Sequence, residues 1–460
     1  MTTTTTTNRS MSSSPKRQRR PSSEDNCRQQ QSQQQRDSFD RFGDDLAELL
    51  LGYLGFDRRV GCECVSRQWR RIVYRTQREL RFGHTYSSSA PRPQTWRQFE
   101  TIVRKCSVGS ITRLEFTDDD YPLNDHKLTA IIKHLPHLLH VSVESYGQVR
   151  RQTWNKFFDR FGRQLRSLRV DPHREDIDYF QNRIGKYCPN LRSLDITNPY
   201  SDRCFHYLTD AAATDGHQTT TVFNQLQRLS LLYANKDTDR FERFVANYGR
   251  TMRTVSVMTS FSLNRVASDI LLTGLSQMSR LVSIEIKYYP SQTFSVSIGR
   301  LLPRIGQNLS QLKRLSIEWY HADGQHIVEV IDTLNRNFRH IQRLELKGMI
   351  YNESQPMSAP LDQLTRLTHL KLNVHNLVVG DQPLLARIDR LFPRLRYLFV
   401  TEADLSPEAL KSLCRLKRIQ YVYITFPGEQ LDITVIRDTL LASCPTIREV
   451  SSNCALNYLF

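Results

Sequence analysis

Three groups of residues have types and spacings that could carry chemistry. The stretch "VSRQWRRIV" (residues 65–73) sets a tryptophan among three arginines, a combination that can stack on a base and neutralise phosphate. The consecutive aspartates at 118–120 could attract a cation. The nine cysteines could bind a metal or form disulfides. Each possibility competes with a plainer structural interpretation.

The tryptophan stretch has the spacing of one helix face. On an α-helix, Val65, Trp69, Ile72 and Val73 lie at i, i+4, i+7 and i+8. The arginines then lie elsewhere around the helix. This favours a buried or partner-covered face with a solvated basic edge, rather than a helix that binds nucleic acid.

The aspartates and cysteines have poor spacing for catalysis or metal binding. The aspartates lie at an expected turn without spaced partners, and no Cys-x-x-Cys pair occurs anywhere in the chain. The sequence also lacks a P-loop, a dinucleotide-binding glycine motif, His-Glu-x-x-His and Gly-x-Ser-x-Gly. We therefore expect no catalytic residue, no metal and no cofactor, in a reduced intracellular protein with free thiols.

Composition leaves the partner open. Lysine and arginine total 64 against 47 for aspartate and glutamate, a net charge of +17 that suits nucleic acid, an acidic protein surface or solubility alone. No apolar run approaches the roughly 18 residues of a membrane span, so no membrane partner is expected. Residues 1–38 are predicted to be a disordered, low-complexity basic tail. The basic cluster at 16–20 is either a nuclear-import signal or part of a soluble tail, so the predicted residence is cytoplasmic, nuclear or both.

Folded sequence begins with a small helical unit over residues 39–83. Apolar residues recur at i, i+3, i+4, i+7 and i+8 in its first helix, at Leu46, Leu49, Leu50, Tyr53 and Leu54. Asp44 and Asp45 suit the N-terminus of that helix. A unit of this size seldom buries enough surface to be stable alone, so one side is expected to receive a partner.

The stretch "FDRFGDDLAELLLGYLGFDRRVGCECVSRQWRRIV" resembles an F-box, with an acidic pair, an apolar helix and Val-x-x-x-Trp. The family's usual Leu-Pro at the entry is replaced here by Phe42-Gly43. The resemblance implies binding to the Skp adaptor of cullin-RING ubiquitin ligases. By position, the implied adaptor contacts are Phe42, Leu46, Leu49, Leu50, Leu54, Val65 and Trp69.

The rest of the chain is a repeat. The pattern L-x-x-L-x-L occurs thirteen times between residues 111 and 447, about 28 residues apart, with helical patterns in between. This resembles a leucine-rich-repeat array, which implies an α/β horseshoe-shaped solenoid of about 13 strand-helix repeats over residues 111–460, with residues 84–110 as a linker or capping segment. Cys188-Pro189 and Cys444-Pro445 fall at helix ends, where structural caps are favoured over reactive thiols. Ser406 and Pro407 are predicted to begin a helix.

The repeat pattern also predicts a binding surface. Positions four and six of L-x-x-L-x-L point into the core, whereas positions three, five and seven point to the concave side. The later repeats place a largely basic strip and an aromatic patch there. An exposed cluster of aromatic residues favours binding over packing against the C-terminal tail or a loop, and the basic strip is either part of that binding surface or a solvated face. The predicted surface residues are Arg314, Arg343, Lys347, His369, Lys371, Tyr397, Phe399, Tyr421 and Tyr423.

These observations predict a non-catalytic substrate receptor of a Skp-cullin-F-box ubiquitin ligase. The helical unit would bind the adaptor, and through it the cullin and RING subunits, while the array would bind an unknown target protein. The alternative is a leucine-rich-repeat scaffold that binds protein or RNA independently of ubiquitination. The F-box resemblance favours the first function, since a plain scaffold has no need of an under-sized helical unit, and makes nucleic acid the less expected partner.

Overall fold

The chain divides into two compact units, Met1–Thr76 and Gln77–Phe460. The whole predicted tail (residues 1–38), Phe42, Asp118 to Asp120 and Cys444 lie outside the described residues. The computed structural model describes residues 43–54, 56–82, 96–107, 109–117, 122–143, 149–171, 176–196, 225–259, 263–288, 292–322, 324–350, 361–373, 382–400 and 406–424, with short pieces at 223, 357–358, 377–379, 437–438, 440–442, 447 and 449–451.

The first unit is helical. It contains α2 (Asp44–Gly52), α3 (Phe56–Gly61), the 3-10 helix η2 (Cys62–Cys64) and α4 (Arg67–Arg75). Ser66 begins α4, because its hydroxyl oxygen accepts a hydrogen bond from the backbone N–H of Trp69 at 3.2 Å. Among the residues described in this unit, six buried apolar residues form its interior: Ala47, Leu51, Trp69, Ile72, Val73 and Tyr74.

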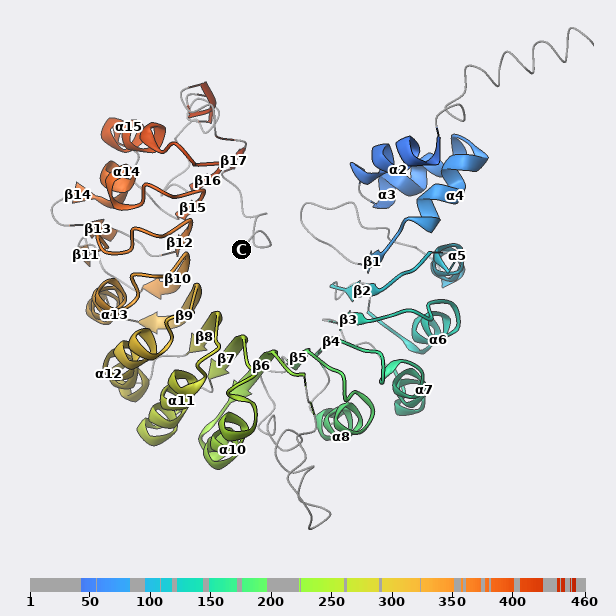
Figure 1. Cartoon of the computed structure of the whole chain (residues 1–460), viewed down its shortest axis with the longest axis horizontal. Helices are drawn as coiled ribbons and strands as arrows, with labels where there is room; N and C mark the ends of the chain where they lie inside the picture. Colours follow the sequence, from blue (N-terminus) through green and yellow to red (C-terminus); the bar gives the residue numbers. More distant parts are fainter. Residues whose placement is uncertain are drawn as a thin grey trace, which may run out of the picture. The chain divides into compact units, whose positions relative to one another are not determined.

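The second unit is built on a sheet of fourteen strands whose described pairs are all parallel (Figure 1). These strands pair in the order in which they occur along the chain, and β11, β13 and β14 are not part of this sheet. The fourteen strands are β1 (Glu79–Phe82), β2 (Arg113–Phe116), β3 (His140–Val143), β4 (Ser167–Val170), β5 (Ser193–Ile196), β6 (Arg228–Tyr233), β7 (Thr254–Thr259), β8 (Ser283–Tyr288), β9 (Arg314–Ala322), β10 (Arg343–Ile350), β12 (His369–Asn373), β15 (Tyr397–Val400), β16 (Tyr421–Ile424) and β17 (Glu449–Ser451).

Helices connect these strands and cover one face of the sheet (Figure 1). None of the described helices of this unit lies on the other face, called the open face below. The helices are α5 (Trp96–Cys106), α6 (Asp125–His134), α7 (Arg151–Phe161), α8 (Ile177–Tyr187), α10 (Thr238–Tyr248), α11 (Arg265–Gln277), α12 (Gln292–Asn308), α13 (Gly324–Asn337), α14 (Ile388–Leu391) and α15 (Pro407–Arg415), with the 3-10 turns η4 (Asn235–Asp237) and η5 (Leu384–Arg387).

The alternation of side chains along the strands follows the repeat pattern. In the repeat that begins at Leu281, Leu281, Ile284 and Ile286 are fully buried, whereas Ser283 and Glu285 are half-buried. Ser406 caps α15 by accepting a hydrogen bond from the N–H of Ala409. Strand alternation, parallel order and helical connections confirm the predicted α/β leucine-rich-repeat solenoid.

The sheet begins earlier than the repeat pattern predicted. Strand β1 lies in the range assigned to the helical unit, and α5 lies in the range assigned to a linker. Leu80 and Phe82 are fully buried at positions four and six, but position one is Gln77 instead of an apolar residue. A search for L-x-x-L-x-L therefore misses this first strand.

The number of residues between paired strands varies along the chain, but the pairing register of the sheet is kept. Paired residues lie 26 positions apart between β4 and β5, as for Leu168 and Leu194. They lie 35 positions apart between β5 and β6, as for Leu194 and Leu229, where the sequence predicted an enlarged connection. A separate small sheet, β11 (Met357–Ser358), β13 (Leu377–Val379) and β14 (Gln382–Pro383), was not predicted. No helix among the described residues has the length and apolar character that crossing a bilayer requires.

Candidate protein-binding surfaces

Helix α2 of the first unit exposes a group of large apolar side chains. The exposed fraction is 56% for Leu49 and 80% for Tyr53, and both Leu46 and Leu50 are also exposed. We call Leu46, Leu49, Leu50 and Tyr53 the α2 apolar face. The opposite side of α2 buries Ala47 and Leu51, so the helix is apolar on both sides. Exposed apolar side chains gathered in this way are typical of a surface that a partner covers.

The other residues implied as adaptor contacts lie in different environments. Val65 is exposed, and Leu54 is half-buried. Trp69 is buried in the interior of the first unit beside Ile72 and Val73. The buried helix face predicted from "VSRQWRRIV" is therefore present for Trp69, Ile72 and Val73, and its indole contributes to the stability of the unit.

The arginines of α4 lie on the exposed side of that helix. Arg71 and Arg75 contact the Asp44 carboxylate at the start of α2, at 2.9 Å and 3.2 Å. The Gln68 side-chain amide donates to the same carboxylate at 2.9 Å. That hydrogen bond, followed by the arginine contacts, lowers the pKa of Asp44. Arg71, one of the three arginines that suggested nucleic acid, thus connects α4 to α2 together with Arg75.

On the open face of the second unit, charged side chains alternate in sign from β8 to β12. The Lys287 ammonium lies 3.2 Å from Glu285 and 3.8 Å from Glu318. The Lys347 ammonium lies 3.8 Å from Glu318 and 3.1 Å from Glu345. Glu345 also contacts Lys371 at 3.1 Å. We call these residues the charge ladder: Glu285, Lys287, Glu318, Lys347, Glu345 and Lys371.

Lys371, at one end of the charge ladder, is almost fully buried. Lys371 is only 2% exposed, and its ammonium also lies 4.8 Å from the centroid of the Phe399 ring. Burial lowers the pKa of Lys371, partly opposed by Glu345. At Glu345 the raising effect of burial is outweighed by Lys371 and Lys347, which leaves its pKa lowered. Lys371 and Lys347 were predicted as contacts for a partner, but their charges are compensated by glutamates within the sheet.

Aromatic rings stack beside this ladder. His369, Tyr397 and Tyr421 occupy one register row of β12, β15 and β16, with ring centroids 4.1 Å and 4.7 Å apart and interplanar angles of 12° and 7°. We call these three the ring stack. Phe399 and Tyr423 stack at 4.3 Å in the adjacent row and are both buried. Of the four predicted surface Tyr and Phe rings, only Tyr397 and Tyr421 are partly exposed.

Two arginines continue the row of the ring stack. Arg314 on β9 and Arg343 on β10 pair in register with each other, and Arg343 pairs with His369. Arg314 is exposed and Arg343 is half-buried. We call them the arginine pair. Among the described residues, no carboxylate lies within ion-pair distance of either guanidinium. Burial and the charges of Arg343, Arg314 and Arg396 lower the pKa of His369 to about 4, so this imidazole is neutral at pH 7.

The structure thus divides the predicted surface residues into two groups. Arg314, Arg343, Tyr397 and Tyr421 remain accessible in one row, in which His369, between Arg343 and Tyr397, is buried. Lys371, Phe399 and Tyr423 form the second group and are buried. Sequence reasoning did not pair the lysines with glutamates, although the signal was present, because Glu285, Glu318 and Glu345 occupy positions five and seven of adjacent repeats.

The cysteines of the second unit that were predicted as caps are partly described. Cys188 follows α8 directly and is fully buried, and burial raises the pKa of its thiol to about 12. Cys106 at the end of α5 has the same environment and the same raised pKa. Thiols that remain protonated at neutral pH are poor nucleophiles.

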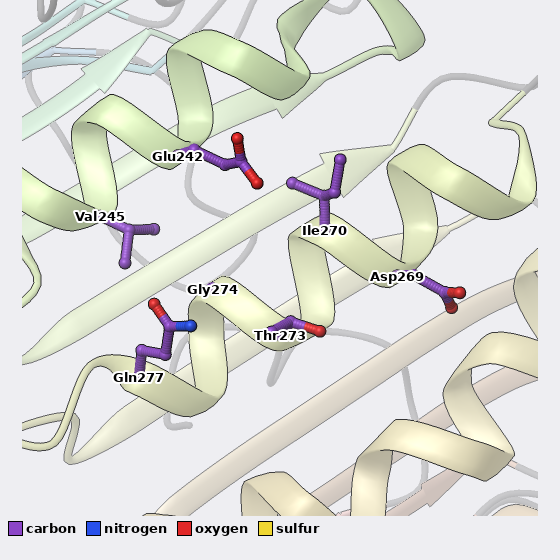
Figure 2. Close-up of a pocket in the computed structure, with 7 residues that line it drawn as sticks. All are labelled: Glu242, Val245, Asp269, Ile270, Thr273, Gly274 and Gln277. Carbon is purple, nitrogen blue, oxygen red and sulfur yellow. The ribbon is translucent and has the colours of Figure 1, made fainter.

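A cavity of ≈ 290 Å³ lies on the helical side of the sheet, between α10 and α11. Figure 2 shows that Asp269 points away from Glu242. The Asp269 carboxylate forms an ion pair with Arg300 of α12. Within the described part of the chain, no three His, Cys, Asp or Glu residues are placed to hold a metal ion. The residues lining the cavity are Glu242, Val245, Asp269, Ile270, Thr273, Gly274 and Gln277.

Comparison with known proteins gives only distant likenesses. No protein-family model and no curated protein matches the sequence. Among solved structures, a Rad7 and Elc1 complex from yeast has a TM-score of 0.48 and 14% identity, covering 90% of this chain and 95% of that chain. A Bacteroides fragilis protein has a TM-score of 0.32 and 12% identity, covering 52% and 65%. A TLR13-ssRNA13 complex has a TM-score of 0.30 and 10% identity, covering 77% and 55%.

Proposed function

We propose that this chain is a non-catalytic substrate receptor of a Skp-cullin-F-box ubiquitin ligase. The first unit is an F-box that binds a Skp-type adaptor, and the repeat array binds the target protein. The observation that carries this proposal is the α2 apolar face, because it lies on a unit whose own interior is small. The resemblance of residues 39–80 to an F-box names the partner that would cover it.

The energetics favour a covered face. Leu46, Leu49, Leu50 and Tyr53 are four large apolar side chains on about two turns of helix. Burying one such side chain contributes about 1.5–3 kcal/mol relative to leaving it exposed. An amphipathic helix that needs stability only for its own unit has no use for apolar residues on its outer side. A partner with an apolar groove gains from all four.

The mechanism is one of proximity. The array holds a target protein while the adaptor, cullin and RING subunits bring the ubiquitin-loaded enzyme to it. Bond formation is carried out by those other chains, and the contribution of this chain is to raise the local concentration of the acceptor lysine. No group of this chain takes part in the chemical step.

The test is capture of the full-length protein by a purified Skp-type adaptor. Wild type should be captured stoichiometrically, whereas Leu49→Arg should not, because it places a charge in the centre of the α2 apolar face. Leu49 is exposed, so this substitution leaves the interior of the unit intact. The matched control is Val266→Arg, which introduces the same charge at an exposed apolar residue on α11 of the array.

Two results would sink the proposal. One is capture of Leu49→Arg at wild-type levels, and the other is a folded wild-type protein that the adaptor does not capture. The second result would leave a free-standing repeat scaffold as the function.

A further inference from the structure

The arginine pair differs from the other arginines of the open face that lie on adjacent strands. At the start of the array, Arg81 on β1 lies 2.8 Å from Glu79 and 3.0 Å from Glu115. Arg113 on β2 lies 3.5 Å from Glu115 and 3.8 Å from Glu79. These two positive charges are therefore neutralised by their neighbours.

The arginine pair has no such compensation. Glu345, two residues after Arg343, is the carboxylate that corresponds to Glu115, but it contacts Lys347 and Lys371 instead. The residue two positions after Arg314 is Ser316, which carries no charge. Two guanidinium groups on adjacent strands, without a carboxylate among the described residues, repel each other. This arrangement is stabilised when an anion binds between them.

The ring stack determines which part of its aromatic rings a ligand can contact. Tyr397 lies between His369 and Tyr421, so both faces of its ring are covered. Only its edge can be exposed, and the edge of an aromatic ring carries partial positive charge. A nucleic-acid base needs an uncovered ring face for stacking, which Tyr397 does not have. An anionic oxygen, by contrast, is attracted by both the ring edge and the arginine pair.

We propose that the arginine pair and the edge of the ring stack form a docking site for an acidic segment of the target protein. Arg314 and Arg343 hold its carboxylate or phosphate groups, since guanidinium groups bind either anion in a bidentate manner. The lysines of the charge ladder are not part of this docking site, because their charges are already compensated by glutamates. This inference deepens the proposed function and rests on it, because it states the chemistry of the target.

The experiment measures fluorescence anisotropy of labelled short peptides with the full-length protein. Three peptides share an apolar and glycine framework and differ only in carrying glutamate, phosphoserine or glutamine at the same positions. The glutamate or the phosphoserine peptide should bind, and the comparison of the two shows which anion the site prefers. The glutamine peptide should not bind. A short single-stranded RNA serves as the nucleic-acid probe.

The variant Arg314→Gln/Arg343→Gln should weaken binding of the acidic peptide by about tenfold. The control Arg336→Gln/Arg415→Gln removes the same charge from α13 and α15 on the helical side, where both side chains are exposed, and should leave the affinity unchanged. Equal weakening in the two variants would overturn the proposal, because it would indicate attraction to net charge alone. So would absence of acidic-peptide binding at low salt, or arginine-pair-dependent binding of RNA in preference to the peptides.

Adaptor capture of the same proteins separates this inference from the proposed function. If the arginine-pair variant keeps the wild-type circular-dichroism spectrum and the large thermal transition of the array, the array is folded, and a lost peptide affinity is due to the missing guanidinium groups. If wild type binds the acidic peptide but not the adaptor, the ligase assignment fails while the docking site stands.

Discussion

Glu345 is the residue on which the charge ladder depends most. Its carboxylate contacts two ammonium groups at 3.1 Å, and one of them, Lys371, is almost fully buried. A buried charge that loses a close partner of opposite charge is costly, whereas replacing a buried charge by an apolar group of similar size is often neutral. The two ends of the same ion pair should therefore respond differently to substitution.

We expect Glu345→Gln to lower the free energy of unfolding of the array by about 3 kcal/mol, because the buried Lys371 ammonium loses the carboxylate that lies 3.1 Å from it. Lys371→Met should change it by less than about 1 kcal/mol, because Glu345 keeps Lys347 and the methionine can cover Phe399. Urea unfolding of both variants measures the difference. Equal losses would show that the pair contributes through attraction alone and that burial has little part.

For single residues, the sequence predicted the sheet face on which a side chain lies better than its burial and its contacts. The period of two along each strand placed Arg314, Arg343, Tyr397 and Tyr421 correctly on one face of the sheet. It could not show that Lys371 is buried, because that depends on a cross-strand partner. Nor could it show that ring faces are covered, which depends on stacking across strands that are 28 and 24 residues apart in register.

Helices of adjacent repeats approach closely where glycine allows it. A Cβ atom added to Gly306 of α12 would lie 2.7 Å from the backbone oxygen of Asn337, at the end of α13. Gly299, seven residues earlier in the same helix, has no heavy atom within 4 Å of that position. One helix thus provides both a contact glycine and an open glycine.

Gly306→Ala should destabilise the protein by about 1–3 kcal/mol, because α12 and α13 must separate to admit the methyl group. Gly299→Ala should stabilise it by about 0.5–1 kcal/mol, because alanine restricts the unfolded chain and nothing obstructs it. Thermal unfolding of the two variants tests the difference in sign. Stabilisation by Gly306→Ala would mean that the helices have room to move apart.

At the scale of elements, the sequence predicted whether a segment is a helix or a strand better than it predicted where the sheet begins. Ser406 and Pro407 marked the start of α15 because capping is a local interaction. Strand β1 was missed because Gln77 occupies the position of the first apolar residue. Packing against β2 makes it a strand, and that information lies more than thirty residues away in the chain.

The two units of the chain differ in what stabilises them. Fourteen strands of the second unit, from β1 to β17, form one continuous sheet, whereas the described interior of the first unit consists of a few apolar residues around Trp69. A core this small is sensitive to a single truncation. Separate compact units can unfold in separate transitions.

We expect calorimetry to show a small transition for the first unit and a larger one for the array. Trp69→Ala should shift or abolish the small transition, since truncating a buried tryptophan costs about 3–5 kcal/mol. The large transition should not move. Arg67→Ala, an exposed position on the same helix, is the control and should leave both transitions in place. A single transition that shifts as a whole would show that the units unfold together.

For the whole chain, periodicity carried most of the prediction. Thirteen similar stretches are hard to interpret except as stacked repeats. The helical unit was recognised by its composition and its resemblance, but its exposed face could be located only from which side of α2 is buried. The charges of the open face are compensated between repeats, and no single repeat contains both members of these ion pairs.

The register between β5 and β6 continues although the connection there is nine residues longer than the one before it. Each strand pairs only with its two neighbours, so the length of chain between two strands does not alter the rest of the sheet. Such a molecule can gain or lose whole repeats, or lengthen one connection, and keep its remaining surface unchanged. Descendants of one ancestral chain could therefore acquire different open faces by changing the number of repeats, while helix α2 of the first unit stays as it is.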